Sequence, residues 1–202
     1  MYALVIDGSI SRYFNYPKGF TLEDLQYPAD IFMKWSVAEK KAIGIYEVVF
    51  DDSNKKDEKW YINTNQSFAF ANDTVTASYG TATPKAHADT LFTAQDETDG
   101  LGTEGELATR GLKYNLIQTV KQQTAGILND TDWYITRNAE KSTAIPSAIT
   151  THRDLVRSRQ ATMETQITNA SDTPALETLY TYTEDSDGVQ SRPLAELPTL
   201  EI

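Results

Sequence analysis

The sequence of 202 residues contains no cysteine and only two histidines. Without cysteine there is no disulfide framework, thiolate zinc site, iron–sulfur cluster or cysteine nucleophile. Two histidines, His87 and His152, are too few for a three-histidine zinc site. We therefore expect neither a metal centre nor a cofactor.

Basic residues are also scarce, because 18 Lys and Arg stand against 29 Asp and Glu and give a net charge of −11. Nucleic acid is not an expected partner, since phosphate binding requires a basic face. No apolar run approaches the roughly 20 residues of a membrane helix. The N-terminus has neither the basic nor the apolar region of a signal peptide. We therefore expect no membrane partner.

The charge divides the chain into three parts. Residues 1–104 carry 9 basic and 16 acidic side chains, residues 105–170 carry 8 and 6, and residues 171–202 carry 1 and 7. The net charges are therefore −7, +2 and −6. A slightly basic middle segment between two acidic ones favours an organisation in separate parts.

Residues 1–95 read as a small, mainly β domain. Asp7-Gly8 and Asn72-Asp73 each stand between two strand-like runs, and such dipeptides are strong hairpin signals. Residues 43–50 are rich in β-branched and aromatic side chains, which favours another strand. We expect an antiparallel sheet with one short helix packed on it.

Residues 96–202 are predicted to form a linker, then helices and then an extended segment. Residues 96–106, with their glycines and acids, are a linker, and residues 107–182 form an antiparallel helical hairpin followed by a short third helix. Residues 183–202 form an extended acidic C-terminal tail. The expected fold class is therefore α+β, with a small N-terminal antiparallel β domain, a helical hairpin and a tail.

The seam of the hairpin follows from helical spacing of apolar residues. The predicted seam, which also serves as the partner interface, consists of Leu112, Leu116, Val120, Ile149, Leu155, Val156 and Met163. These side chains are too few to close a core alone, so the pair needs the β domain, another copy or another protein. His152 and Arg159 fall on the same expected stripe, which favours a packed or interfacial role for the histidine.

The residues between the helices carry a family resemblance. Thr-Asp-Trp-Tyr-Ile-Thr-Arg at residues 131–137, Ile-Pro at 145–146, and the pairs His152-Arg153 and Val156-Arg157 resemble the C-terminal region of bacteriophage tail assembly chaperones and tail-fibre assembly proteins. Those proteins have a helix, a Thr-Asp-Trp turn, a proline that starts a second helix, and a Tyr-Arg-x-x-(apolar)-Arg segment. His152 stands where that tyrosine is usual. The resemblance covers about residues 110–182.

This resemblance implies a non-enzymatic protein of the virion tail, synthesised in the host cytoplasm, with tail or tail-fibre proteins as partners. Tail symmetry further implies a homo-oligomer, a trimer or a multiple of three. The physical role we expect for the motif is a structural anchor. Trp133 would plug the open end of the helix pair, and Asp132 would pair with Arg153 or Arg157. The alternative is that the arginines are solvated and the tryptophan is simply core.

The sequence gives less support to a catalytic or ligand-binding site than to a structural role. There is no nucleophile elbow, phosphate loop or zinc-helix motif. His87 near Asp89 could be a general base but reads more readily as an exposed loop histidine. Asp185-x-Asp187-Gly188 resembles the start of a calcium loop without its closing glutamate. An aromatic set in the β domain could line a sugar-binding face but more often faces a core: Trp60, Tyr61, Phe68, Phe70 and Tyr79.

Three hypotheses remain. The first is a virion structural component that joins tail or tail-fibre subunits through its helical region. The second is a transient tail-fibre assembly chaperone that leaves after assembly, and the third is a receptor- or glycan-binding tail module that works through its β domain. The amount of the protein in virions separates the first two, and glycan binding by the β domain would favour the third.

Overall fold

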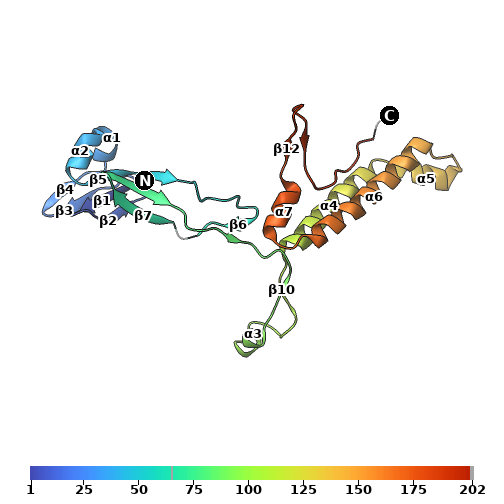
Figure 1. The fold of residues 1–202 in the computed structure, drawn as a ribbon, viewed down its shortest axis with the longest axis horizontal. Coiled ribbons are helices and arrows are strands. Elements are labelled where there is room, and N and C mark those ends of the chain that lie inside the picture. The colour runs from blue at the N-terminus through green and yellow to red at the C-terminus, as the bar shows by residue number, and fades with distance from the viewer. Residues whose placement is uncertain (65, 201–202) are drawn as a thin grey trace. The chain divides into compact units, whose positions relative to one another are not determined.

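The computed structural model describes residues 1–64 and 66–200 and divides into two compact units (Figure 1). Unit 1, Met1–Thr83, is mainly β, and unit 2, Pro84–Ile202, is mainly helical. The mixed α+β class expected from the sequence is confirmed. The boundary falls before the expected residue 95, because residues 86 and 87 already bond to the start of a helix of unit 2.

A five-stranded sheet with the order β2-β1-β5-β8-β7 is the frame of unit 1. Its strands are β1 (Tyr2–Ile6), β2 (Ser9–Phe14), β5 (Ile45–Asp51), β7 (Ser67–Ala71) and β8 (Thr74–Ser78). Both expected hairpins are present, with Asp7 and Gly8 between β1 and β2, and Asn72 and Asp73 between β7 and β8. All four turn residues have positive φ, as the two-residue turns of hairpins require.

The expectation of a purely antiparallel sheet is wrong, because β5 and β8 run parallel. Val75 and Ala77 of β8 are fully buried, whereas β7 alternates exposed and half-buried residues. The more apolar strand of the β7–β8 hairpin therefore takes the central place beside β5. Two smaller pairs complete unit 1: β3 (Phe20–Leu22) with β4 (Leu25–Tyr27), and β6 (Tyr61–Ile62) with β9 (Thr83–Pro84), where the unit ends.

Unit 1 has two apolar clusters and two short helices, α1 (Ile31–Lys34) and α2 (Val37–Ala42). The first cluster comprises Leu4, Phe14, Phe20, Ile31, Phe32 and Ile45. The second comprises Ala3, Val5, Val48, Val75 and Ala77. The sheet curls, since the rings of Tyr13 on β2 and Phe68 on β7 lie 4.6 Å apart between centroids although these strands are opposite edges.

An antiparallel pair of long helices, α4 (Leu112–Asn129) and α6 (Ser147–Asn169), is the frame of unit 2 (Figure 1). Lys113 at the start of α4 donates from Nζ to the carbonyl of Thr168 at the end of α6, at 2.9 Å. Arg153 near the start of α6 donates to the carbonyl of Leu128 at the end of α4. These opposite ends confirm the predicted helical hairpin. A further helix, α5 (Asp132–Lys141), lies in the connection, where no helix was predicted.

Most of the predicted seam is buried between α4 and α6. Leu116, Val120, Ile149, Val156 and Met163 are buried, and Leu112 is half-buried. Leu155 is the exception, because 52% of it is exposed. The buried face of α6 runs through Arg153 and Val156, so that Leu155, one residue away, and Arg159 turn outward. The expectation that Leu155 lies in the seam is wrong.

The C-terminal region packs on these helices, since the side-chain amide of Gln166 on α6 bonds to the carbonyl of Pro193 and the amide of Ala195. Helix α7 (Thr173–Tyr180) begins at the cap Asp172, whose carboxylate accepts from the amide of Ala175. Leu176 of α7 and Leu194 beyond it are fully buried. Between them β12 (Thr183–Glu184) pairs with β13 (Gln190–Ser191). The chain itself therefore supplies part of the apolar partner that the helix pair requires.

The expected linker is also ordered. Residues 90–109, here called the arm, contain β10 (Thr90–Leu91), α3 (Ala94–Thr98) and β11 (Leu107–Thr109), with β10 and β11 paired. Helix α3 has a reciprocal cap between Thr93 and Asp96. Among the described residues, no helix has the length and apolar character needed to cross a membrane.

Candidate interaction site

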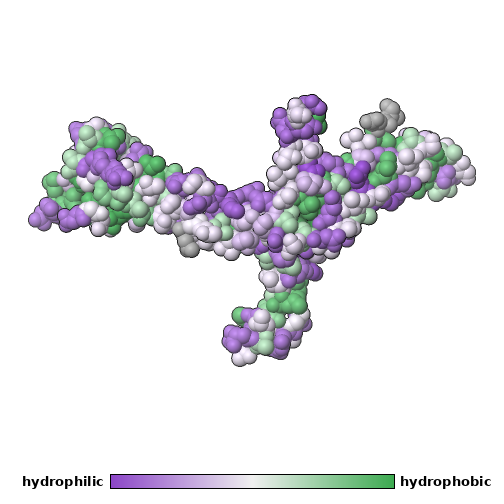
Figure 2. Space-filling view, in the orientation of Figure 1, coloured by the Kyte–Doolittle hydropathy of each residue, from purple (hydrophilic) through white to green (hydrophobic). Residues whose placement is uncertain are grey.

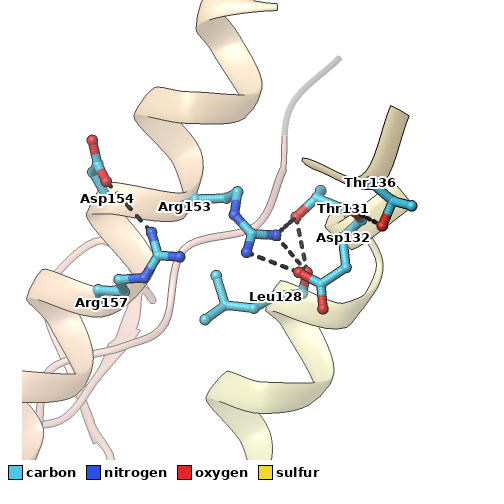
Figure 3. Close-up of polar contacts among 7 residues, drawn as sticks. All are labelled: Leu128, Thr131, Asp132, Thr136, Arg153, Asp154 and Arg157. Atoms are coloured by element: carbon cyan, nitrogen blue, oxygen red, sulfur yellow. Dashed lines mark hydrogen bonds and ion pairs between the residues drawn. The ribbon is translucent and has the colours of Figure 1, made fainter. Parts of the chain in front are cut away.

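The end of the helical hairpin is organised by one buried arginine (Figure 3). The side chain of Arg153 is only 9% exposed and points from α6 towards the connection between α4 and α5. One terminal nitrogen donates to the carbonyl of Leu128 at 2.8 Å and to the hydroxyl of Thr131 at 2.6 Å. The other lies 2.8 Å from a carboxylate oxygen of Asp132. A planar guanidinium suits this task because it bonds several acceptors in a fixed geometry.

The sequence Thr131-Asp132 explains why the chain turns here. The Thr131 hydroxyl donates to the Leu128 carbonyl at 3.0 Å, so it closes α4 instead of capping α5. Asp132 stands in the first turn of α5, where a negative charge is favourable near the positive end of the helix dipole. Arg153 thus joins the end of α4, the start of α5 and α6 at one point.

The predicted pairing of Asp132 with one of two arginines is confirmed for Arg153. Arg157 lies 3.5 Å from Asp154 on its own helix, and both side chains are largely exposed. An exposed pair of this kind contributes little to stability. His152 is buried, as expected for a packed histidine.

The expectation that Trp133 plugs the helix pair is wrong, because 51% of this residue is exposed. Since α5 begins at Asp132, Trp133 belongs to the first turn of a separate helix and not to the seam. Its ring lies on that of Tyr134, with the centroids 3.9 Å apart. The guanidinium of Arg137, one turn further on, lies 4.6 Å from the Trp133 centroid and 5.4 Å from that of Tyr134.

These three residues, Trp133, Tyr134 and Arg137, are here called the α5 cluster. None of the ten residues of α5, all of which are described, is buried. Within the described residues, no carboxylate lies at ion-pair distance from Arg137, and its Nε atom is buried without a hydrogen-bond partner. The guanidinium lies over both tilted rings, and the α5 cluster therefore presents a positive charge beside half-exposed aromatic surface.

The motif at residues 131–137 includes Tyr134 and Arg137, but a physical role was predicted only for its residues Asp132 and Trp133. The spacing of four between Trp133 and Arg137 was a usable signal, because residues four apart on a helix are neighbours. No helix was predicted at these residues, so the two side chains were not expected to be neighbours.

The two residues of the possible acid–base pair are not brought together as a catalytic pair. His87 is half-buried, and its backbone carbonyl accepts from the amide of Lys113 at the start of α4. Asp89 accepts from the amide of Gly111 at 2.8 Å and from the guanidinium of Arg110. Asp89 therefore fastens the base of the arm to the start of α4.

Protonation of Asp89 should loosen this fastening. The bond from the Gly111 amide, and then the one from Arg110, hold the pKa of Asp89 below its ordinary value of 3.8. A lowered pKa means that the contribution is present above the unfolded pKa and is lost as the pH falls through the folded pKa. We expect the Gly111 amide resonance to titrate with a midpoint below 3.8 in NMR spectra of the whole chain.

The variant Asp89→Asn is the control for that titration, because it keeps the shape and removes the titrating group. The amide of Gly111 should then show no transition in this range. A midpoint at or above the ordinary aspartate value in the native chain would contradict the proposed fastening.

The remaining candidate sites are occupied by structural contacts. A carboxylate oxygen of Asp185 accepts from the amides of Asp187 and Val189, so it shapes the turn between β12 and β13. No group of three or more metal-binding side chains occurs in residues 1–64 and 66–200. Trp60 and Tyr61 are buried and cannot belong to an open sugar-binding face.

Comparison with known proteins identifies no relative of the chain. No protein-family model matches the chain, and no curated protein and no solved structure is significantly similar to it. The candidate site therefore rests on its own geometry.

Proposed function

We propose that the chain is a non-enzymatic component of a bacteriophage tail that joins tail or tail-fibre subunits through its helical unit. The observation that carries the proposal is the α5 cluster, which sets Trp133 and Arg137 on an unburied helix at the end of the hairpin. Tryptophan, tyrosine and arginine are the residues most enriched at the centres of protein interfaces. The tail setting is what the resemblance of residues 110–182 implies.

The rigidity of the hairpin end supports a permanent joint. Arg153 ties three helices together directly beside the α5 cluster, so little conformational freedom remains to be lost on binding. A preorganised surface of this kind suits a subunit that stays in an assembly. Copies arranged by tail symmetry would occur as a trimer or a multiple of three.

A transient tail-fibre assembly chaperone is the alternative, since the same exposed aromatic surface would suit a helper that leaves after assembly. A receptor- or glycan-binding module is less favoured, because two aromatic residues considered for the sugar-binding face are buried in unit 1.

Quantitative mass spectrometry of purified virions tests the proposal. We expect the chain at tail-protein abundance, in a copy number that is a multiple of three. Absence from virions, together with binding to a fibre protein in lysates of infected cells, would contradict it and favour the chaperone.

A further inference from the structure

The arm is ordered but has no core of its own. None of residues 83–110, all of which the structure describes, is buried. Leu91, Leu101 and Leu107 are 55%, 64% and 40% exposed, and Figure 2 shows hydrophobic surface along the stem of the arm. A lone two-stranded hairpin is marginally stable in water, so these leucines indicate that another surface covers the arm.

The arm also carries charge of one sign. It contains five acidic residues and no basic one. Two of the acids, Asp96 and Glu97, accept bonds from amides within the arm. Glu104 and Glu106 follow them and are exposed. The surface that covers the arm should therefore offer apolar contact together with an unpaired cation.

The α5 cluster has this complementary character. It combines aromatic surface with the guanidinium of Arg137, for which the described chain provides no carboxylate. Residues 112–169, which contain α4, α5 and α6, carry seven basic and five acidic side chains in a chain whose net charge is −11. An arginine fork binds a carboxylate strongly because two parallel hydrogen bonds form.

We infer that the arm of one copy binds the α5 cluster of a second copy. Within one chain the two surfaces stand at opposite ends of α4, since the arm ends at its start and α5 follows its end. A helix of 18 residues spans about 27 Å. Figure 1 shows the arm extending away from the α4–α6 pair, so the contact forms between copies.

In this contact Glu104 or Glu106 bonds to Arg137, and the leucines of the arm cover Trp133. The two surfaces differ, so the contact is heterologous and joins copies head to tail into a ring or an open filament. This inference rests on the proposed joining role of the α5 cluster and deepens it, because it names the arm of a second copy as the partner of that cluster. The contact between copies is tested on purified protein, whereas the tail role is tested on virions. Failure of either test therefore leaves the other proposal undecided by that result.

The absence of cysteine allows a direct test by disulfide formation. Two full-length variants, Glu104→Cys on the arm and Glu140→Cys on α5, are made separately, mixed and mildly oxidised. We expect a mixed disulfide dimer in severalfold excess over that formed by Glu104→Cys with Lys18→Cys, an exposed position in unit 1. Equal yields in the two mixtures would overturn the inference.

A charge exchange tests the chemistry of the same contact. The variant with both Glu104→Lys and Glu106→Lys, and the variant Arg137→Glu, should each associate about tenfold more weakly in analytical ultracentrifugation. A mixture of the two variants should regain association, because the acidic arm of the Arg137→Glu variant can bind the intact Arg137 of the other variant. Native protein that stays monomeric at high concentration, or variants that associate as the native chain does, would refute the contact.

Discussion

Replacement of Arg153 by alanine should lower the free energy of unfolding of unit 2 by about 2–3 kcal/mol, which is typical when buried acceptors lose a charged donor. The substitution removes the donor from the carbonyl of Leu128 and from the hydroxyl of Thr131, and Thr131 is 2% exposed. Water does not readily take the place of the guanidinium there. Urea unfolding of the whole chain, followed by circular dichroism at the helical band, measures this loss.

Two neighbouring variants serve as controls. Arg157→Ala should change stability by less than about 0.5 kcal/mol, because its pair with Asp154 is exposed. Asp132→Ala should cost less than Arg153→Ala, since 55% of the Asp132 side chain is exposed and the arginine keeps its other acceptors. Equal losses for Arg153→Ala and Arg157→Ala would show that the buried arginine does not hold the hairpin end together.

Replacement of Gly44 by alanine should destabilise unit 1 by more than about 3 kcal/mol, the range of severe backbone and packing defects. Gly44 has a φ of +78°, and a Cβ atom there would lie 2.3 Å from the backbone oxygen of Val5. The carbonyl of Gly44 also accepts from the amide of Val5 at 2.8 Å. Relief of the clash would separate β1 from the start of β5. Urea unfolding monitored by the fluorescence of Trp35 and Trp60 measures the effect.

Gly8→Ala separates the two causes of that effect. Gly8 has a similar φ of +74°, but no atom lies within 4 Å of the position that a Cβ atom would take. Only the left-handed backbone is then penalised, at about 1–2 kcal/mol. If Gly44→Ala cost no more than Gly8→Ala, the close approach of Val5 would not be a constraint on the sheet.

Local chemistry made much of the fold predictable. The hairpin turns at residues 7–8 and 72–73 and the antiparallel helix pair follow from turn residues and apolar spacing. The parallel pairing of β5 with β8 did not follow, because it depends on which strand of a hairpin buries more apolar surface. The docking of Leu194 was missed for a related reason, since its partners lie far away in the sequence.

The site was predicted in part. The ion pair of Arg153 with Asp132 follows from opposite charges placed near the end of a hairpin. The exposure of Trp133 did not, because a large apolar residue is usually buried and only the additional helix α5 carries it outward. The helical spacing of apolar residues placed Leu155 in the seam. In the structure Arg153 is part of the buried face of α6, and Leu155 lies outside that face.

The most direct measurement is the amount of the chain in virions assembled with either the native protein or the Trp133→Ala variant, supplied to phage that lack the gene. Because Trp133 is half-exposed and outside the seam, the variant should fold normally and yet be nearly absent from virions that take up the native chain in a multiple of three. Incorporation of the folded variant at the native level would contradict the assignment of the joining surface to α5.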